Sequence, residues 1–360
     1  IETRAVVVDL PVDATPVSVR RAVELVLARN PMLWARLRPA ADGRPAGFVL
    51  PPTPAPEDRP YFRLTDSVPL DDVVAGAAAA LDPVEGRNIR FVHVGPDGRA
   101  QLVVVANGLV VDDRAWRVLT DQLAVAWSRP HSADTSRPVP ATGHGLAVLL
   151  RDLSARAADP AVHAELDRWR AVAPASRQIP PGLDLSARSR VSLTITAEGV
   201  AAVAATAAAY HTEVGDVLLT ALGLALRTAA DNPVVRATGP VVRLQADARE
   251  TFDAETGTDA HAAMVGAFTT GYPLVLDLTG IDVADALVGG PAAGRALAQV
   301  KESRRTVPAG GIGYGLLRYL NPGIDLPGPG LLRMRYRDLR PVRVHTDAPV
   351  DDLLLDVLFE

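Results

Sequence analysis

Two neighbouring carboxylates, Asp112 and Asp113, stand where an apolar run meets an amphipathic segment in LVVVANGLVVDDRAW (residues 102–116). Aspartate at the head of such a segment is a preferred helix cap, and a carboxylate can also accept or orient a proton. Asn107 and Gly108, which follow the apolar run, carry no group that titrates near neutral pH. We expect Asp112 to be structural, either capping the next helix or pairing with an arginine, and Asp113 to be solvated.

The elements around this segment can be predicted from periodicity and capping. Residues 5–10 form an apolar run that is typical of a buried strand. Thr15 and Pro16 indicate a helix start, since threonine caps well and proline needs no hydrogen-bond partner in the first turn. After Asp113, four apolar residues recur at helical spacing and predict a buried face: Trp116, Leu119, Leu123 and Trp127.

The segment 102–116 resembles the core motif of condensation-type domains of nonribosomal peptide synthetases. In that family a strand runs into His-His-x-x-x-Asp-Gly, and a helix follows. Asn107 and Gly108 take the two histidine positions here, and Asp112 and Asp113 take the Asp-Gly positions. By this resemblance Gly108 replaces the catalytic histidine. The side chain of glycine is a single hydrogen atom, which cannot act as a general base.

Three further segments carry the resemblance along the chain. Residues 16–38 resemble the first helix and the next strand of these domains, and MVGAFTTGYPLVLDL (residues 264–278) resembles a segment of their second lobe. GGIGYGLLRYL (residues 310–320) is similar to a signature of epimerisation domains. Gly311, Gly313 and Gly315 in this stretch suggest a turn rather than a phosphate loop, because no Gly-Lys-Ser/Thr follows.

The resemblance implies an α/β fold of two chloramphenicol-acetyltransferase-like lobes, arranged in a V around a central channel. The sequence predicts an N-terminal lobe over residues 1–172 that contains the degenerate motif. A linker is predicted at 173–188, which is rich in proline, serine and alanine, and a C-terminal lobe at 189–360.

A second catalytic position also differs from the family. Epimerisation domains have a Glu-Gly-His-Gly-Arg stretch, and its counterpart lies within VVRLQADARE (residues 241–250). Gln245 stands at the glutamate position and Asp247 at the histidine position, and glutamine does not take up a proton at useful pH. Arg249 in the same stretch is the predicted partner of Asp112.

Composition excludes several classes of protein. The formal net charge of −5 argues against binding to nucleic acid, because no excess of lysine and arginine is present to neutralise phosphates. No apolar run reaches the ~20 residues that a membrane-spanning helix needs. Cysteine is absent, which excludes disulfides and fits a cytoplasmic protein. The seven histidines show no metal-ligand spacing, so we predict neither a metal nor a cofactor.

With both catalytic positions replaced, the sequence favours a domain that is not an enzyme. The resemblance extends to the X domains of glycopeptide-antibiotic synthetases, which also carry a second Asp where enzymes have Gly. X domains recruit haem-thiolate (cytochrome P-450) oxygenases that crosslink side chains of the peptide on the neighbouring peptidyl carrier domain. The expected function is therefore oxygenase recruitment in antibiotic biosynthesis.

Two alternatives stay open at this stage. An active epimerisation or condensation domain could use displaced groups such as Glu250 or His261, and a structural spacer would bind no partner. Arg333, Arg335 and Arg337 alternate along a predicted strand, with Arg340 and Arg343 beyond it. A solvated strand face is one interpretation of these arginines; docking of an acidic partner is the other, because arginine is enriched at interface anchors.

Overall fold

The structure is a computed structural model. It describes the following residues: 3–39, 45–50, 60–64, 68–95, 100–128, 143–176, 189–229, 236, 239–257, 259, 261–328, 332–338 and 353–359.

Contacts divide the chain into two compact units. Among the described residues, the first unit holds Ile1–Leu150 and Phe252–Phe268, and the second holds Arg151–Thr251, Thr269–Arg340 and the last strand. The predicted lobes, residues 1–172 and 189–360, stay a prediction. The chain returns to the first unit for a short segment after it has entered the second. Most of the predicted linker, residues 177–188, lies outside the described residues.

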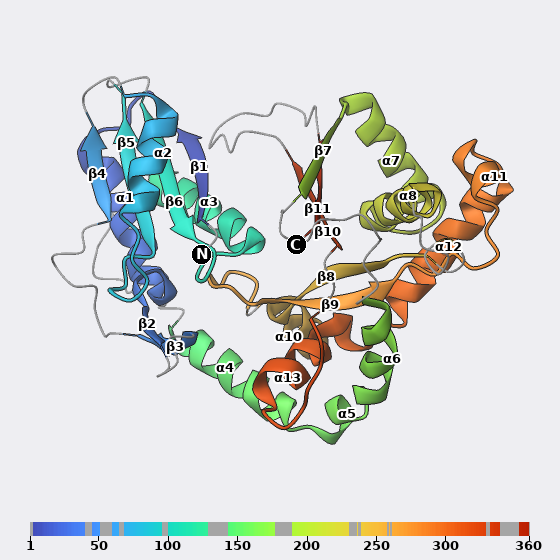
Figure 1. Cartoon of the computed structure of the whole chain (residues 1–360). Coiled ribbons are helices and arrows are strands. Elements are labelled where there is room, and N and C mark those ends of the chain that lie inside the picture. Colours follow the sequence, from blue (N-terminus) through green and yellow to red (C-terminus); the bar gives the residue numbers. More distant parts are fainter. Residues whose placement is uncertain are drawn as a thin grey trace. The chain divides into compact units, whose positions relative to one another are not determined.

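The first unit is built on a four-stranded sheet in the order β1-β6-β5-β4 (Figure 1). Its strands are β1 (Thr3–Asp9), β6 (Gln101–Asn107), β5 (Ile89–Val94) and β4 (Tyr61–Leu64). Only the β4–β5 pair is parallel. The predicted strand over residues 5–10 is confirmed as β1.

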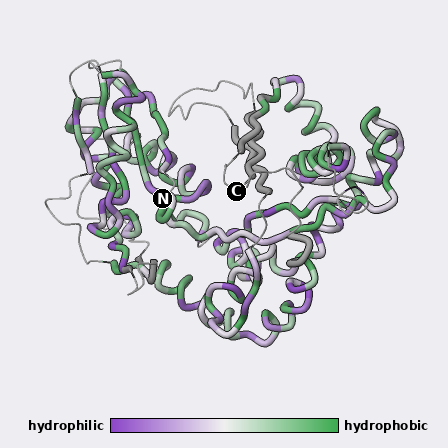
Figure 2. The backbone as a smooth tube through the Cα atoms, in the orientation of Figure 1, coloured by the Kyte–Doolittle hydropathy of each residue, from purple (hydrophilic) through white to green (hydrophobic). Residues whose placement is uncertain are grey.

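Strand β6 is buried on both faces, which explains why its sequence is a continuous apolar run. On one face, Val103 and Val105 pack with residues of β5 and of helix α2 (Leu70–Ala79) in one hydrophobic cluster. On the other face, Leu102 and Val104 are also buried. Figure 2 shows the hydrophobic colour of these central strands.

Helix α1 (Pro16–Arg29) begins at Thr15, as the sequence predicts. The Thr15 hydroxyl accepts from the backbone N–H of Ser18 at 3.2 Å, and the Ser18 hydroxyl accepts from the N–H of Thr15 at 2.9 Å. Helix α1 packs against α3 (Asp113–Ser128). Along α3, Trp116 is buried as predicted, whereas Trp127 is half-buried, which corrects its assignment to the core. The unit also contains the following elements: η1 (Pro31–Trp34), β2 (Arg36–Pro39), β3 (Pro45–Val49) and most of α4 (Gly143–Ala157).

The second unit is built on a five-stranded sheet in the order β7-β11-β10-β8-β9. Its strands are β7 (Ser189–Ile195), β11 (Leu353–Phe359), β10 (Leu332–Asp338), β8 (Val241–Asp247) and β9 (Thr269–Val275). Strands β10 and β8 are parallel, and the other neighbours are antiparallel.

Helices and short 3-10 turns complete the second unit. They are α5 (Pro160–His163), α6 (Leu166–Ser176), α7 (Ala197–Ala209), α8 (Val214–Ala229), α11 (Val283–Leu287), α12 (Pro291–Arg305), η2 (Pro308–Gly311) and α13 (Ile312–Leu320). Helix α10 (Ala248–Thr256) begins in the second unit and ends in the first. In the described part of the chain, no helix has the length and apolar character of a membrane span.

The glycines of GGIGYGLLRYL serve close packing. Gly311 has a φ of +91°, and a Cβ there would lie 2.3 Å from the Tyr272 ring. A Cβ on Gly313 would lie 2.2 Å from Oε2 of Glu165. Of the glycines predicted to form a turn, only Gly311 lies in one, at the end of η2; Gly313 and Gly315 lie in helix α13, which follows directly. These glycines bring α13 against its neighbours, and nothing in their placement resembles a phosphate loop.

Candidate functional site

The turn after β6 is held by buried amides. Asn107 is 1% exposed; its Nδ2 donates to Oδ1 of Asn88 at 2.8 Å, and its Oδ1 accepts from the N–H of Leu109 at 3.1 Å. Asn88 in turn donates to the carbonyl of Ala35 at 2.7 Å. Asn107 therefore shapes the turn, and Gly108 follows it at a half-buried position.

Asp112 links two segments of the first unit. Its Oδ1 accepts from the N–H of Ala115 at 2.8 Å, which is the predicted cap of α3, and its Oδ2 accepts from the N–H of Phe268 at 3.0 Å. The side chain is 8% exposed. Asp112 thus fixes both the start of α3 and the chain that leads into β9. Its predicted partner Arg249 belongs to the other unit, and that pairing stays a prediction.

Asp113 lies one residue further on and forms an ion pair with Arg4 of β1. The Asp113 side chain is 42% exposed, and that of Arg4 is 15% exposed. A pair of this exposure contributes little to stability. The carboxylate is therefore reachable from solvent, as expected, although it has a basic neighbour.

The counterpart of the second catalytic position lies on β8 and α10. Gln245 is exposed and stands opposite Gly271 of β9 in the sheet register. Asp247 accepts two hydrogen bonds from Nε and Nη2 of Arg249, at 2.9 and 2.7 Å, and Arg249 is fully buried. Glu250 follows as an exposed residue of α10. Asp247 therefore neutralises a buried arginine rather than standing free to transfer protons.

A buried histidine–aspartate pair lies at the end of α10, within the first unit. Nδ1 of His261 lies 2.8 Å from Oδ1 of Asp253, and the backbone N–H of His261 donates to the same oxygen at 3.1 Å. Both residues are 8% exposed. The sequence marked His261 as a displaced candidate, but it missed Asp253. A spacing of eight residues across a loop matches no recognisable motif.

A groove of about 380 Å³ runs between α1 and α3. Its walls are mostly apolar, with Arg29, Asp121 and Gln122 as the polar residues among those that line it. Ala262 and Ala263, which follow His261 directly, form a third wall, and Gln122 donates to the carbonyl of Ala263 at 3.4 Å. The chain that carries His261 is thus packed against α3.

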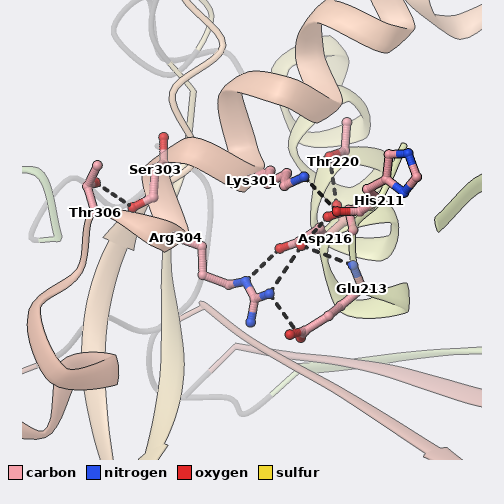
Figure 3. A network of polar contacts seen from close by, with 9 residues as sticks. His211, Glu213, Asp216, Thr220, Lys301, Ser303, Arg304 and Thr306 are labelled. Atoms are coloured by element: carbon pink, nitrogen blue, oxygen red, sulfur yellow. Dashed lines mark hydrogen bonds and ion pairs between the residues drawn. The ribbon is translucent and has the colours of Figure 1, made fainter. Parts of the chain in front are cut away.

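The second unit contains a polar network of a different kind (Figure 3). Arg304 of α12 donates from Nε to Oδ1 of Asp216 at 2.6 Å and also pairs with Glu213 at 2.9 Å. Lys301 donates to the carbonyl of His211 at 2.6 Å, at the end of the turn between α7 and α8. These contacts connect α12 to that turn. In the described part of the chain, no cluster of three or more histidine or acidic residues could hold a metal ion.

The predicted arginine strand is present as β10, between β11 and β8. Arg333, Arg335 and Arg337 occupy alternate positions, opposite Leu358, Asp356 and Leu354 of β11. Alternate positions share one face of a strand. Arg340 and Arg343 lie outside the described residues, and the docking role of this strand stays a prediction.

Comparison with known sequences finds relatives among large synthases. No protein-family model matches the chain. Surfactin synthase subunit 1 of Bacillus subtilis (strain 168) is 30% identical over 251 residues, which are 67% of this chain and 6% of that protein. Bacitracin synthase 3 of Bacillus licheniformis is 29% identical over 263 residues, 70% of this chain and 4% of that protein. The chain therefore spans a small fraction of the length of the relatives that it matches.

Solved structures of three kinds share the fold over 99% of this chain. The epimerization domain from the third module of tyrocidine synthetase B has a TM-score of 0.68 at 19% identity and is covered over 86% of its length. The first condensation domain of the calcium-dependent antibiotic synthetase, in complex with a substrate analogue, has a TM-score of 0.64 at 16% identity, with 85% covered. The complex of the X-domain and OxyB from teicoplanin biosynthesis gives 0.59 at 14% identity, with 82% covered.

The predicted condensation-domain fold is confirmed by these structures. The sequence relatives and structural neighbours together support the superfamily of condensation and epimerisation domains of nonribosomal peptide synthetases. The X domain is one neighbour among several, so the predicted X-domain subtype is not confirmed.

The prediction that this domain is not an enzyme is wrong. It rested on Gly108 and Gln245, whereas the sequence relatives are synthases and the structural neighbours include epimerisation and condensation domains. Gly108 and Gln245 carry no group that takes up a proton, but the unit that holds Gly108 also contains the pair of His261 and Asp253.

Proposed function

We propose that this condensation-type domain is a catalytic part of a nonribosomal peptide synthetase. It acts on an aminoacyl or peptidyl thioester that a carrier domain presents, and its reaction is epimerisation at the α-carbon. The supporting observation is the match to an epimerization domain over 99% of this chain, with a TM-score of 0.68. The signature at residues 310–320, which is similar to that of epimerisation domains, agrees with it.

The reaction needs proton transfer and no other reagent. A base removes the proton from the α-carbon, so the C–H bond breaks and its electron pair moves into the thioester as an enolate. A proton returned to the opposite face re-forms the C–H bond and inverts the centre. A base for this step must come within hydrogen-bond reach of the α-proton.

The frame around the family's catalytic turn is retained in this chain. Strand β6 ends at Asn107, whose buried amide shapes the turn, and Asp112 fixes the helix that follows. Asp112 stands at the aspartate position of the motif, whereas Asn107, Gly108 and Asp113 depart from it. The ordered turn after β6 and the fixed start of α3 support a site that holds a substrate in one position.

An α-proton exchange assay tests this function. The chain is mixed in D₂O with a peptidyl carrier domain that carries an L-dipeptidyl pantetheine thioester, over a panel of dipeptides. We expect deuterium at the α-carbon and appearance of the D-epimer, with the loaded carrier alone as control. An aminoacyl-loaded acceptor carrier is added in parallel; a longer peptide without deuterium would assign condensation instead. Neither product over the whole panel would overturn the catalytic function.

A second candidate function is recruitment of a haem-thiolate oxygenase. The complex of the X-domain and OxyB among the structural neighbours favours it, together with the Asp112–Asp113 pair. Arg333, Arg335 and Arg337 on β10 would supply the docking face. Calorimetric titration with the oxygenases encoded beside the synthetase tests this function. Charge reversal at Arg335 and Arg337 should weaken a saturable interaction, and an unchanged affinity would remove these residues from the interface.

A further inference from the structure

The Asp253 carboxylate fixes the imidazole of His261 in one orientation. Oδ1 accepts from two groups of the same residue, the backbone N–H at 3.1 Å and the ring nitrogen Nδ1 at 2.8 Å. Two contacts between one oxygen and one residue hold the ring plane as well as its position. The Phe252 ring lies beside the imidazole, with centroids 6.2 Å apart.

This geometry also sets which ring nitrogen can act. A carboxylate accepts hydrogen bonds, so Nδ1 carries a proton, and Nε2 is left with the lone pair in the neutral ring. An aspartate that holds the Nδ1 proton of a histidine is the arrangement by which hydrolases orient a general base. The His261 side chain keeps 11% of its surface exposed, so the ring is not sealed inside the unit.

The segment that carries His261 is tied to the turn that holds Gly108. The carbonyl of Ala263 accepts from Gln122 of α3, and the N–H of Phe268 donates to Asp112. Asp112 lies four positions after Gly108 in the chain. The histidine is therefore carried by a segment that is fixed at two points to the helix after the family's catalytic turn.

Other titratable groups in the described residues fit the role less well. His93 is fully buried on β5, with its Nδ1 3.1 Å from the hydroxyl of Tyr61. His163 and His211 are exposed, and Nδ1 of His163 lies 3.0 Å from a backbone carbonyl. Asp247 is engaged by a buried arginine. His261 is the imidazole that combines a carboxylate partner with residual exposure.

We propose that His261, oriented by Asp253, is the proton-transfer residue of this domain and takes the role of the motif histidine that Gly108 replaces. Nε2 takes the α-proton of the carrier-bound thioester as the C–H bond breaks and the electron pair enters the enolate. A proton returned from Nε2 to the same face restores the starting centre. Inversion takes a proton from solvent on the opposite face, while the protonated ring releases its own proton to solvent. This inference rests on the catalytic function proposed above, since it assigns a residue to that reaction.

The test compares α-proton exchange in variants of the full chain, with the same loaded carrier in D₂O. We expect His261→Gln to lower the exchange rate roughly 100-fold, within the range that a general base supplies. Asp253→Asn should also lower it, because an amide can present its N–H to the ring and favour the wrong tautomer. Added imidazole should restore part of the rate to His261→Ala, which a purely structural role for His261 would not allow.

Matched controls make the result decisive. His163→Gln removes an exposed imidazole and should leave the rate unchanged, and the urea midpoint of each variant shows that it is folded. A folded His261→Gln variant with the exchange rate of the wild type would overturn the assignment while leaving the catalytic function in place. If His261→Gln does not fold, the exchange rates of Asp253→Asn and of His261→Ala with and without imidazole decide instead. Wild-type exchange rates in both variants, with no effect of imidazole, would overturn the assignment. Absence of exchange in the wild type would overturn both proposals.

Discussion

Two buried aspartates, one in each unit, have partners of different chemistry. Asp216 of α8 is 1% exposed and receives two hydrogen bonds from Arg304, at 2.6 and 3.1 Å, as well as one from the hydroxyl of Thr212 (Figure 3). Asp253 of α10 is 8% exposed, and its Oδ1 contacts both the backbone N–H and the ring of His261. The two carboxylates are similarly buried, but an arginine keeps its charge where a histidine can lose it.

The difference separates a structural pair from one that can do chemistry. Burial lowers the pKa of Arg304. Its hydrogen bond to Asp216 and the charges of Asp216 and Glu213 raise that pKa by more, so the net pKa lies above the usual range. Arg304 therefore stays charged at every useful pH, and the network does one thing, which is to hold α12 against the turn before α8. An imidazole can accept and release a proton, so the pair in the first unit can take part in a reaction.

The largest expected effect is on stability, at Asp216. Asp216→Ala leaves a half-buried guanidinium and the Thr212 hydroxyl without their acceptor. Breaking a buried ion pair typically costs about 3 kcal/mol or more, and we expect about 3 kcal/mol here because Glu213 still contacts Arg304. Urea unfolding measures it as a lower midpoint with an unchanged slope.

A pair on the same helix supplies the control. Glu302 and Arg305 are paired at 2.9 Å but are largely exposed, and Glu302→Gln should leave the urea midpoint unchanged. An equal drop in the urea midpoint for Asp216→Ala and Glu302→Gln would mean that burial does not distinguish these two pairs. The structural role of the network would then be wrong.

The second effect is smaller and lies in the first unit. Asp253→Asn keeps a side chain that can hydrogen-bond to His261, with the amide N–H toward the ring, so we expect a loss of about 1 kcal/mol in the free energy of unfolding. Asp253→Ala removes the acceptor altogether and should cost about 2 kcal/mol. Thermal and urea unfolding of the two variants give these values. If the asparagine variant lost as much as the alanine variant, the carboxylate charge itself would be holding the fold, as it does at Asp216.

Local signals account for the part of this molecule that could be predicted from sequence. The Thr15 cap and the Asp112 cap depend on contacts within a few residues, the strand over 5–10 was indicated by its own apolar run, and all three are present. The condensation-domain fold could be predicted because several separate segments resemble the family in the right order. Trp127 was assigned to the core from its helical spacing, which cannot tell how far a neighbouring element extends over a helix.

The candidate site shows why the rest could not be predicted. The loss of histidine at Gly108 is visible in the sequence, and it led to the wrong conclusion that the domain is not an enzyme. Asp253 and His261 are eight residues apart and come together because the chain turns back after α10, which no short motif records. The second contact of Asp112, to Phe268, joins residues 156 positions apart and follows only from the tertiary fold.

A third carboxylate extends the comparison to a neutral partner. Glu165 is half-buried, and its Oε2 accepts from the indole N–H of Trp169 at 2.9 Å. Burial raises the pKa of Glu165 above its usual value of 4.5, although the hydrogen bond to Trp169 and the charges of Arg156 and Arg168 oppose that shift. A neutral donor offsets burial less than a cation does, so the net pKa of Glu165 stays above its usual value.

The smallest expected effect therefore depends on pH. Between the pKa of Glu165 in the unfolded chain, near 4.5, and its higher pKa in the folded protein, the folded state holds more protons. Stability accordingly falls as pH rises through that window, and the loss is complete above it. Glu165→Gln cannot ionise and still accepts from Trp169, so its Tm should exceed that of the wild type by of order 1 °C at pH 7 and by less at pH 4. A Tm difference that is the same at both pH values would show that the ionised carboxylate is not destabilised by burial. A neutral donor would then stabilise a half-buried carboxylate as well as a cation does.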